Sequence, residues 1–156
     1  VAVFGFLAAA GEAGFVQARH LTRGFLASHA MITRFESLGP QSTADDAAGL
    51  LLRTTQQEFP VLGPSGNLLG AVTRAGLVEA IRDRGRAAPV SSFMATGIPL
   101  AGERADLGAV YQTLQRQRVP MVGIVDSGQR LVGYVTAENF AELVMIRGAG
   151  EGPRTP

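Results

Sequence analysis

Two threonines stand where an apolar segment ends and a helix is expected to begin, a position that suits phosphate binding. Thr73 follows Gly70–Val72, and Thr136 follows Gly133–Val135. A hydroxyl group and the free backbone N–H groups of a helix start can donate hydrogen bonds, and the helix dipole favours an anion there. The same hydroxyls could equally serve as helix caps, which is a common role of threonine at this position.

Residues that would support a catalytic or metal site are missing from the pattern. The chain has no cysteine, and its two histidines, His20 and His29, have no partner pattern. There is no HExxH sequence and no Gly-rich phosphate loop of the ATPase type. Because no nucleophile–base pair or metal-ligand set is visible, we expect a chain that is not an enzyme and holds no metal.

The two threonines belong to an internal repeat, which must position them. Residues 59–77 and 119–140 both contain an apolar-Pro-apolar run, a polar turn, and an apolar-Gly-apolar-apolar-Thr segment. Most anchors lie 63 positions apart, as Gly70 and Gly133 do, whereas Pro60 and Pro120 lie 60 apart. We interpret this difference as small insertions between the anchors. A repeat of this length fixes the architecture.

Each repeat predicts the element order β-α-β-β-α. In the first, a helix starts at Ser42 or Thr43, strands span 59–62 and 68–73 around a turn at 64–67, and a closing helix follows. In the second, Asp106 caps a helix with apolar residues at helical spacing, strands span 119–125 and 130–136, and a helix closes the unit. A short extra strand is expected near residues 98–100.

Composition favours a packed pair of small units. Hydrophobic residues make up 46% and charged residues 17%, which suits a soluble core rather than disorder. The net charge of +1 is too small to indicate a nucleic-acid partner. One unit of this size buries too little surface alone. We therefore predict an α/β (α+β) fold in which the two repeats pack face to face through a pseudo-twofold axis.

The two ends of the chain carry separate expectations. Residues 1–10 are almost wholly apolar, yet ten helical residues rise only about 15 Å, whereas a membrane span needs about 20 residues. The segment 1–27 is either the end of a longer membrane helix or a soluble amphipathic helix and linker. Residues 148–156 lack apolar anchors and are expected to be disordered.

The repeats resemble CBS (cystathionine β-synthase) domains, and two in tandem resemble a Bateman module. The resemblance assigns 28–88 to a first CBS repeat and 89–147 to a second. It implies a regulatory, non-catalytic module that binds an adenosine-type ligand such as AMP, ADP, ATP or S-adenosylmethionine and forms a homodimer. Two alternatives remain: a purely structural dimerisation module, and the CBS pair of an ion transporter.

The N-terminal segment is similar to the end of site-2-type intramembrane zinc metalloproteases, whose last membrane helix leads into CBS domains. The matching residues are Ala9, Ala10, Glu12, Gln17, Arg19 and Leu21. This resemblance implies a parent protease whose metal ligands lie upstream. It places the module, soluble by itself, at the cytoplasmic face of the membrane.

The family's nucleotide signature has an Asp three residues after the Ser or Thr, where it accepts hydrogen bonds from a ribose. Here Gly76 and Asn139 occupy that position. Because a hydrogen bond to a charged acceptor contributes about 1.5–3 kcal/mol, the loss would weaken binding about tenfold to a hundredfold. Asn139 keeps one acceptor, so the site at Thr136 is favoured. The resemblance implies as ligand-contacting residues Phe59, Thr73, Arg74, Arg118, Val119, Pro120, Thr136 and Asn139, with Arg130 as a further phosphate partner.

Overall fold

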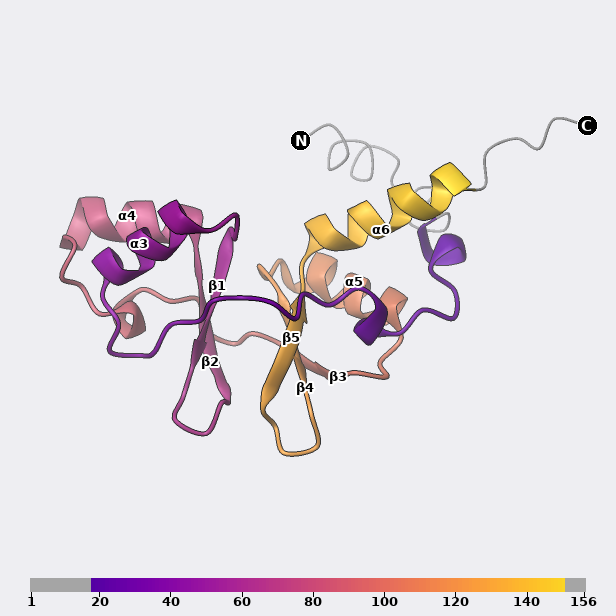
Figure 1. The fold of residues 1–156 in the computed structure, drawn as a ribbon, viewed down its shortest axis with the longest axis horizontal. Helices are drawn as coiled ribbons and strands as arrows, with labels where there is room; N and C mark the ends of the chain where they lie inside the picture. Colours follow the sequence, from indigo (N-terminus) through magenta and orange to yellow (C-terminus); the bar gives the residue numbers. More distant parts are fainter. Residues whose placement is uncertain (1–17, 151–156) are drawn as a thin grey trace, which may run out of the picture.

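The computed structural model describes residues 18–150, which form two α+β lobes standing side by side (Figure 1). The first lobe, repeat 1, consists of helix α3 (Ala44–Arg53), strands β1 (Glu58–Leu62) and β2 (Leu68–Thr73), and helix α4 (Arg74–Arg84). The second, repeat 2, consists of strand β3 (Leu100–Gly102), helix α5 (Leu107–Gln117), strands β4 (Val122–Val125) and β5 (Leu131–Val135), and helix α6 (Ala137–Gly150). The predicted mixed fold of two repeats is confirmed.

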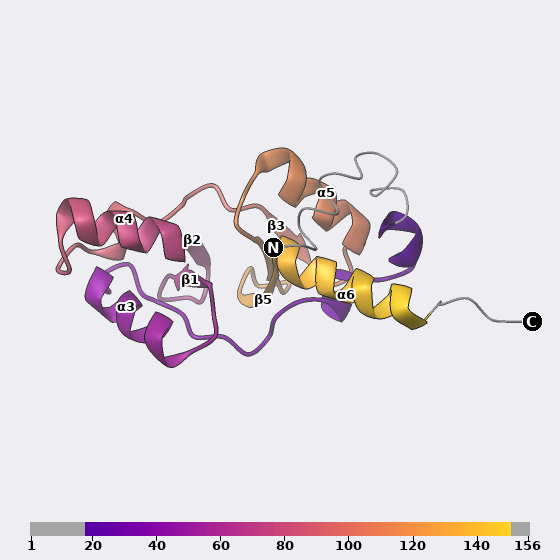
Figure 2. The same cartoon turned by 90° about the horizontal axis from the view of Figure 1, so that it is seen from above.

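Two helices pack side by side in each lobe, α3 with α4 and α5 with α6, as Figure 2 shows from above. Strands β1 and β2 form an antiparallel pair. In repeat 2, β4 and β5 form the same pair, and β3 adds a parallel strand beside β4. In repeat 1 the strand that would match β3 is reduced to a single parallel bridge between Leu38 and Val61.

Side-chain caps fix where the helices begin, as the sequence predicted. Helix α3 starts with a reciprocal cap, because the Thr43 hydroxyl accepts from the Asp46 N–H (3.2 Å) and the Asp46 carboxylate accepts from the Thr43 N–H (2.8 Å). Helix α5 starts where the Asp106 carboxylate accepts from the Ala109 N–H (2.9 Å). It ends at Arg118, whose φ of 51° is left-handed.

The second repeat follows the first at a constant distance in the sequence. Helices α3 and α5 begin at Ala44 and Leu107 (107 − 44 = 63), and strands β2 and β5 begin at Leu68 and Leu131, again 63 apart. Two short 3-10 turns, η1 (Ala27–His29) and η2 (Val90–Ser92), obey the same offset. The duplication therefore contains no insertion across these elements, and every position in repeat 1 has an identifiable counterpart in repeat 2.

The two prolines used to align the repeats are not counterparts. Pro60 lies inside β1 opposite Ala71, whereas Pro120 precedes β4. The position that matches Pro60 at the constant offset is Gly123, which lies opposite Tyr134 in β4 and β5. The inference of small insertions was therefore wrong. Both residues are prolines, but they occupy different positions relative to their strands. Strand β4 is correspondingly shorter than predicted, and β3 begins at Leu100 rather than near residue 98.

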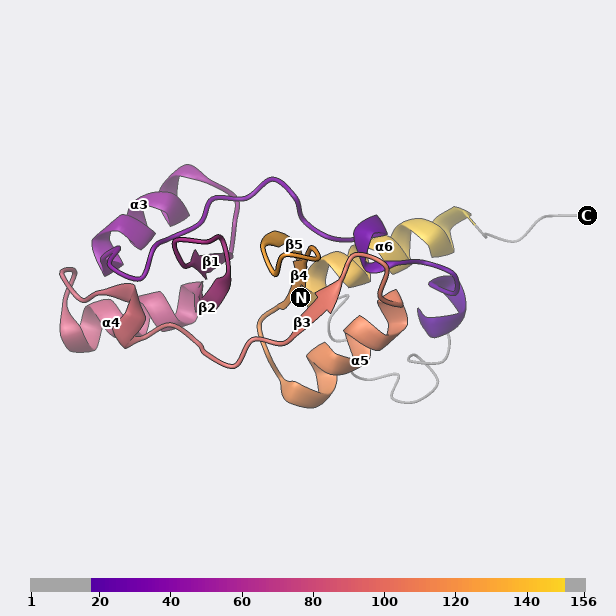
Figure 3. The same cartoon turned by 90° about the horizontal axis from the view of Figure 1, so that it is seen from below.

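Each repeat is completed by the segment that precedes the other repeat in the chain. Turn η1 packs on repeat 2, where the Ala27 N–H donates to the Ala105 carbonyl (2.8 Å). Turn η2 packs on repeat 1, where the Val90 N–H donates to the Ser42 carbonyl (2.7 Å). Figure 3 shows the connecting segments after these turns passing on opposite sides of the strand pairs. Repeat 2 is thus assembled from two separate stretches of sequence, with repeat 1 inserted between them.

The strand pairs of the two repeats meet around Tyr134. This side chain is fully buried together with Ala71 and Met121, and Phe35 meets its ring edge-on at 5.3 Å between centroids. Tyr134 and Ala71 are counterparts at the constant offset. Because a large ring from one repeat faces a methyl group from the other, the packing near the pseudo-twofold axis is asymmetric.

The ends of the chain were predicted only in part. Helix α6 continues to Gly150, so residues 148–150 are helical where the disordered tail was expected to start. Residues 151–156, and residues 1–17 of the expected N-terminal helix and linker at 1–27, lie outside the described residues. Between residues 18 and 150, no helix has both the length and the apolar character needed to cross a membrane.

Candidate functional site

A cavity of about 630 Å³ opens between the two repeats. Its walls come from three parts of the chain: the segment after η1, the loop between α3 and β1, and the junction of β5 with α6. The lining residues are Ile32, Thr33, Arg34, Phe35, Glu36, Thr54, Thr55, Gln56, Gln57, Glu58, Tyr134, Thr136, Glu138, Asn139 and Glu142. This volume suits a ligand of nucleoside size.

Thr136 and Asn139 form the cap that starts α6 at the cavity wall. The Asn139 side-chain oxygen accepts from the Thr136 N–H (2.6 Å) and hydroxyl (2.8 Å), and the Asn139 N–H donates to the Thr136 hydroxyl (3.2 Å). The Asn139 side-chain nitrogen donates to the Ala30 carbonyl. The amide that was expected to accept a ribose hydroxyl is thus engaged in holding the segment before repeat 1 against α6.

Gln56 joins the other two walls of the cavity. Its side-chain oxygen accepts from the Glu36 N–H (2.7 Å), and its side-chain nitrogen donates to the carbonyls of Glu36 and Glu58 (both 2.9 Å). The Gln56 side chain thus satisfies backbone groups of Glu36 and Glu58 that a neighbouring β-strand would otherwise pair with. They hold the connecting segment beside the start of β1 and so fix the width of the cavity.

Glu58 is the titratable group most affected by this environment. Burial and the nearby Glu138 carboxylate raise the pKa of Glu58 to about 7, against a smaller lowering by a backbone hydrogen bond. Burial, followed by the charge of Glu58, raises the pKa of Tyr134 to about 12. The Tyr134 hydroxyl lies 3.5 Å from the Glu58 carbonyl oxygen, to which it donates a long hydrogen bond. The cavity wall therefore contains a carboxyl group that changes charge near neutral pH.

Glu58 should make the stability of the protein fall as pH rises from about 4.5 to about 7, because the folded state binds its proton more tightly than the unfolded chain does. Replacing Glu58 with glutamine removes this dependence. Since the carboxyl is partly exposed, we expect a gain of about 1–2 kcal/mol near pH 8, or about 3–6 °C in melting temperature. Thermal melts across this pH range measure both effects.

The matched control for this prediction is Glu103→Gln, since Glu103 does not line the cavity. It should leave the slope of melting temperature against pH unchanged. A Glu58→Gln variant with the slope of the parent protein would show that another group carries the dependence.

Two of the eight residues expected to contact a ligand, Thr136 and Asn139, line the cavity. Phe59 does not, because it is buried in the core of repeat 1. Four of the other five lie at the positions that match the cavity wall on the opposite side of the pseudo-twofold axis. Residues 118–120 are the counterparts of residues 55–57, and Thr73 is the counterpart of Thr136; Arg74 follows Thr73 at the start of α4.

The lining residues from repeat 1 were not predicted, because each threonine was expected to share its site with the start of the strand pair in its own repeat. In the structure Thr136 of repeat 2 shares its cavity with the loop before β1 of repeat 1. The constant offset of 63 is compatible with either arrangement, so it did not reveal the crossed one.

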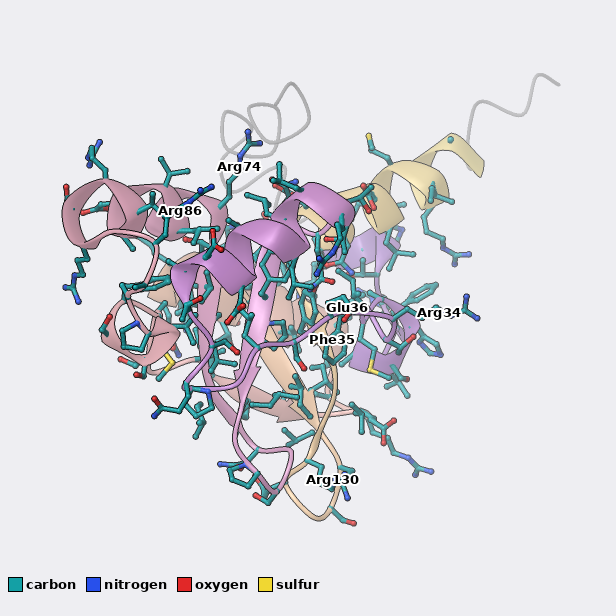
Figure 4. All side chains as sticks on the ribbon, turned by 60° about the vertical axis from the view of Figure 1, so that its left-hand side comes forward. Arg34, Phe35, Glu36, Arg74, Arg86 and Arg130 are labelled. Carbon is teal, nitrogen blue, oxygen red and sulfur yellow. The ribbon has the colours of Figure 1, made fainter. Side chains whose placement is uncertain are left out.

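The arginines proposed as phosphate partners are dispersed. In Figure 4, Arg74 lies at one end of the strands and Arg130 at the other, beside the turn between β1 and β2. Neither lines the cavity, and Arg118 does not either. The one arginine in the cavity lining is Arg34, whose exposed side chain extends outward from the connecting segment in Figure 4.

Comparison with known families gives a match over most of the chain. The family model described as "CBS domain" matches twice, at residues 27–83 and 90–146. An uncharacterized protein of Methanocaldococcus jannaschii is 43% identical over 42 residues, which is 27% of this chain and 25% of that protein. The match therefore spans about a quarter of the length of that relative.

Solved structures with the same fold include three CBS proteins. The CBS domain of a bacterial CNNM/CorC family Mg²⁺ transporter has a TM-score of 0.73 at 20% identity, over 89% of this chain and 91% of that one. The CBS domain pair of protein MJ0100, in complex with 5′-methylthioadenosine and S-adenosyl-L-methionine, has 0.69 at 20%, over 81% and 97%. CBSX2 in complex with AMP has 0.66 at 20%, over 82% and 98%.

Proposed function

Because this chain belongs to the CBS domain family and carries two copies in tandem, we propose that it binds an adenosine-type ligand in the cavity beside Thr136 and thereby regulates the protein that contains it. CBS pairs are regulatory, non-catalytic modules. The observation that carries the proposal is a cavity of nucleoside size walled by both repeats. The solved CBS pairs in complex with AMP and with S-adenosylmethionine support the choice of ligand class.

The cavity offers the polar groups that an adenosine requires. The first turn of α6 leaves backbone N–H groups without intrahelical partners beside Thr136, and backbone groups of the connecting segment lie opposite. Asn139 does not supply the ribose acceptor of the family signature, because its amide oxygen is taken up by the cap. The Glu58 and Glu138 carboxylates line the same cavity and supply acceptors for two ribose hydroxyls.

Titration with adenosine-type ligands tests this function. Calorimetry with AMP, ADP, ATP and S-adenosylmethionine should give heat for at least one of them. A ligand present at about 100 times its Kd should stabilise the protein by about 2.7 kcal/mol, visible as a rise in melting temperature. No heat and no thermal shift at millimolar ligand would contradict the proposal.

A pair of matched variants tests on which side of the pseudo-twofold axis the ligand binds. Thr33 and Thr96 are both exposed and occupy counterpart positions, but Thr33 lines the cavity beside Thr136. Thr33→Trp should fill this cavity and weaken binding at least tenfold, whereas Thr96→Trp should leave binding intact. The reverse result would move the ligand to the opposite side of the pseudo-twofold axis.

A second candidate function is dimerisation without a small-molecule ligand. Leu52 and Val78 are 84% and 55% exposed on the adjacent helices α3 and α4, and both are apolar. Such side chains favour a contact with a second copy of the chain. Light scattering separates the two candidates: this one requires a dimer whose mass does not change with nucleotide, and a monomer at tens of micromolar counts against it.

For the parent protein, the proposal is a membrane zinc metalloprotease of the site-2 type, with this module at the cytoplasmic face. Its support is the resemblance of the N-terminal segment, of which only Arg19 and Leu21 lie among the described residues. The CBS domain of the Mg²⁺ transporter supports the alternative of an ion transporter. The reading frame upstream of Val1 discriminates: an HExxH on an apolar helix favours the protease, and several long apolar spans without it favour the transporter.

A further inference from the structure

The cavity beside Thr136 is strongly acidic. Four carboxylates line it, from Glu36, Glu58, Glu138 and Glu142, against the single cation of Arg34. With all five groups ionised the formal charge is −3 (1 − 4 = −3). The ion pairs found within residues 18–150, Arg82 with Asp83 and Arg86 with Asp45, lie outside the cavity lining. None of the ion pairs found among these residues therefore involves a carboxylate of the cavity lining.

The repeat architecture does not require this charge. At the constant offset, the counterparts of Glu36, Glu58 and Glu138 are Pro99, Met121 and Ala75. Of the four acidic positions, only that of Glu142 keeps a carboxylate in its counterpart, Glu79. The same backbone thus builds the equivalent wall without three of the carboxylates. Three of the four carboxylates are therefore particular to this cavity and are not a requirement of the repeat architecture.

The carboxylates come from different parts of the chain and converge on one space. Glu36 lies on the connecting segment, Glu58 at the start of β1, and Glu138 with Glu142 on the first turns of α6. Gln56 holds the first two walls together through its three hydrogen bonds. The carboxylates interact with one another within the protein, since the charge of Glu138 raises the pKa of Glu58.

We propose that this cavity selects an adenosine-type ligand that carries a positive charge or none, and that its carboxylates exclude nucleoside phosphates. The inference rests on the proposed function and narrows its ligand class. A phosphate group near pH 7 carries about −1.5 to −2 charges. Glu58 is half-buried and the other three glutamates are exposed. Bringing a phosphate among these carboxylates is unfavourable, whereas a sulfonium or ammonium group gains from the same field. Repulsion of the wrong ligand is a recognised route to specificity.

Three probes that share the adenosine group but differ in charge test the proposal. S-adenosylmethionine carries a sulfonium cation, 5′-methylthioadenosine is neutral at the corresponding position, and AMP carries a phosphate there. Calorimetry on the whole chain near pH 8, with a chelator present, should give an affinity for AMP at least tenfold below that for 5′-methylthioadenosine. S-adenosylmethionine should bind as tightly as the neutral ligand or more tightly. Raising the salt concentration should reduce the spread.

Two variants and a control assign the effect to the cavity. Glu58→Gln and Glu138→Gln should each narrow the gap between AMP and the sulfonium ligand, by roughly fivefold to tenfold per charge removed. Glu79→Gln removes the same charge outside the cavity lining, at the position that matches Glu142. It should leave the order and spacing of the three affinities unchanged.

The outcomes separate the two proposals. Binding of AMP more tightly than 5′-methylthioadenosine, or binding of AMP that requires Mg²⁺, would overturn the charge selection while leaving an adenosine-binding function in place. A preference that changes in Glu79→Gln instead of Glu138→Gln would likewise overturn it. Failure of all three probes to bind would overturn the proposed function and this inference together.

Discussion

Replacing Tyr134 with alanine should destabilise the protein by about 3–5 kcal/mol, the range measured for truncating a buried aromatic side chain. Tyr134 is fully buried where the strands of the two repeats meet, against Ala71 and Met121. Because its counterpart is only an alanine, the other repeat has no ring at the matching position to fill the space. Such a loss is a large part of the total of about 5–15 kcal/mol for a typical domain.

Chemical denaturation measures this prediction, and Tyr134→Phe is its control. The phenol hydroxyl donates a long hydrogen bond, at 3.5 Å, to the Glu58 carbonyl, so removing it should cost less than about 1 kcal/mol. A difference of less than about 1 kcal/mol between the alanine and phenylalanine variants would contradict a central packing role for the ring. The slope of the transition should be compared as well, because loss of contact between the lobes can break two-state unfolding.

Replacing Gly133 or Gly70 with alanine should destabilise the protein by about 1–3 kcal/mol each, through overpacking. A Cβ atom at Gly133 would lie 2.8 Å from the Ile32 carbonyl oxygen and 2.9 Å from the Met31 sulfur. A Cβ atom at Gly70 would lie 2.6 Å from the carbonyl oxygen of Ala95, the counterpart of Ile32. In both places the obstacle is backbone that pairs with the neighbouring strand residue, so it cannot rotate away as a side chain could.

Gly49→Ala is the matched control for these variants. Gly49 lies in α3, and its added Cβ would meet nothing closer than the Arg53 side chain at 3.7 Å. Because alanine has a higher helix propensity than glycine, this change should stabilise the protein by about 0.5–1 kcal/mol. Melts of the three variants under one condition compare the effects directly. If Gly133→Ala were as stable as the parent protein, the close approach of the segment before repeat 1 would not be a requirement of the fold.

Local features of the fold could be predicted because their causes are local. Asp106 and Thr43 each satisfy backbone donors within one helical turn, so the start of a helix can be read from neighbouring residues. The strand pairs were predictable from apolar runs around polar turns. The left-handed conformation of Arg118, which ends α5, was not expected, since no glycine or asparagine stands there to indicate it.

The candidate site was harder to predict because it is assembled from residues far apart in the sequence. The hydrogen bond between Asn139 and Ala30 joins positions 109 apart, and that between Gln56 and Glu36 joins a loop to a connecting segment. Nothing in the local pattern distinguishes a repeat that closes on itself from a pair that exchanges segments. The residue types at Thr136 and Asn139 were identified, but their partners in the cavity depend on that exchange.

The exchange of segments between the repeats has a consequence for the order in which the chain folds. During synthesis residues 33–95 emerge as one stretch that contains repeat 1 together with turn η2, so this lobe has all its parts while the ribosome is still producing repeat 2. The segment around Ala27 must wait for Ala105, and Ala30 for Asn139, before either finds its place. Such distant contacts require closure of long loops and raise the contact order, which slows folding. The N-terminal segment therefore docks last, and it joins the lobe whose wall completes the cavity.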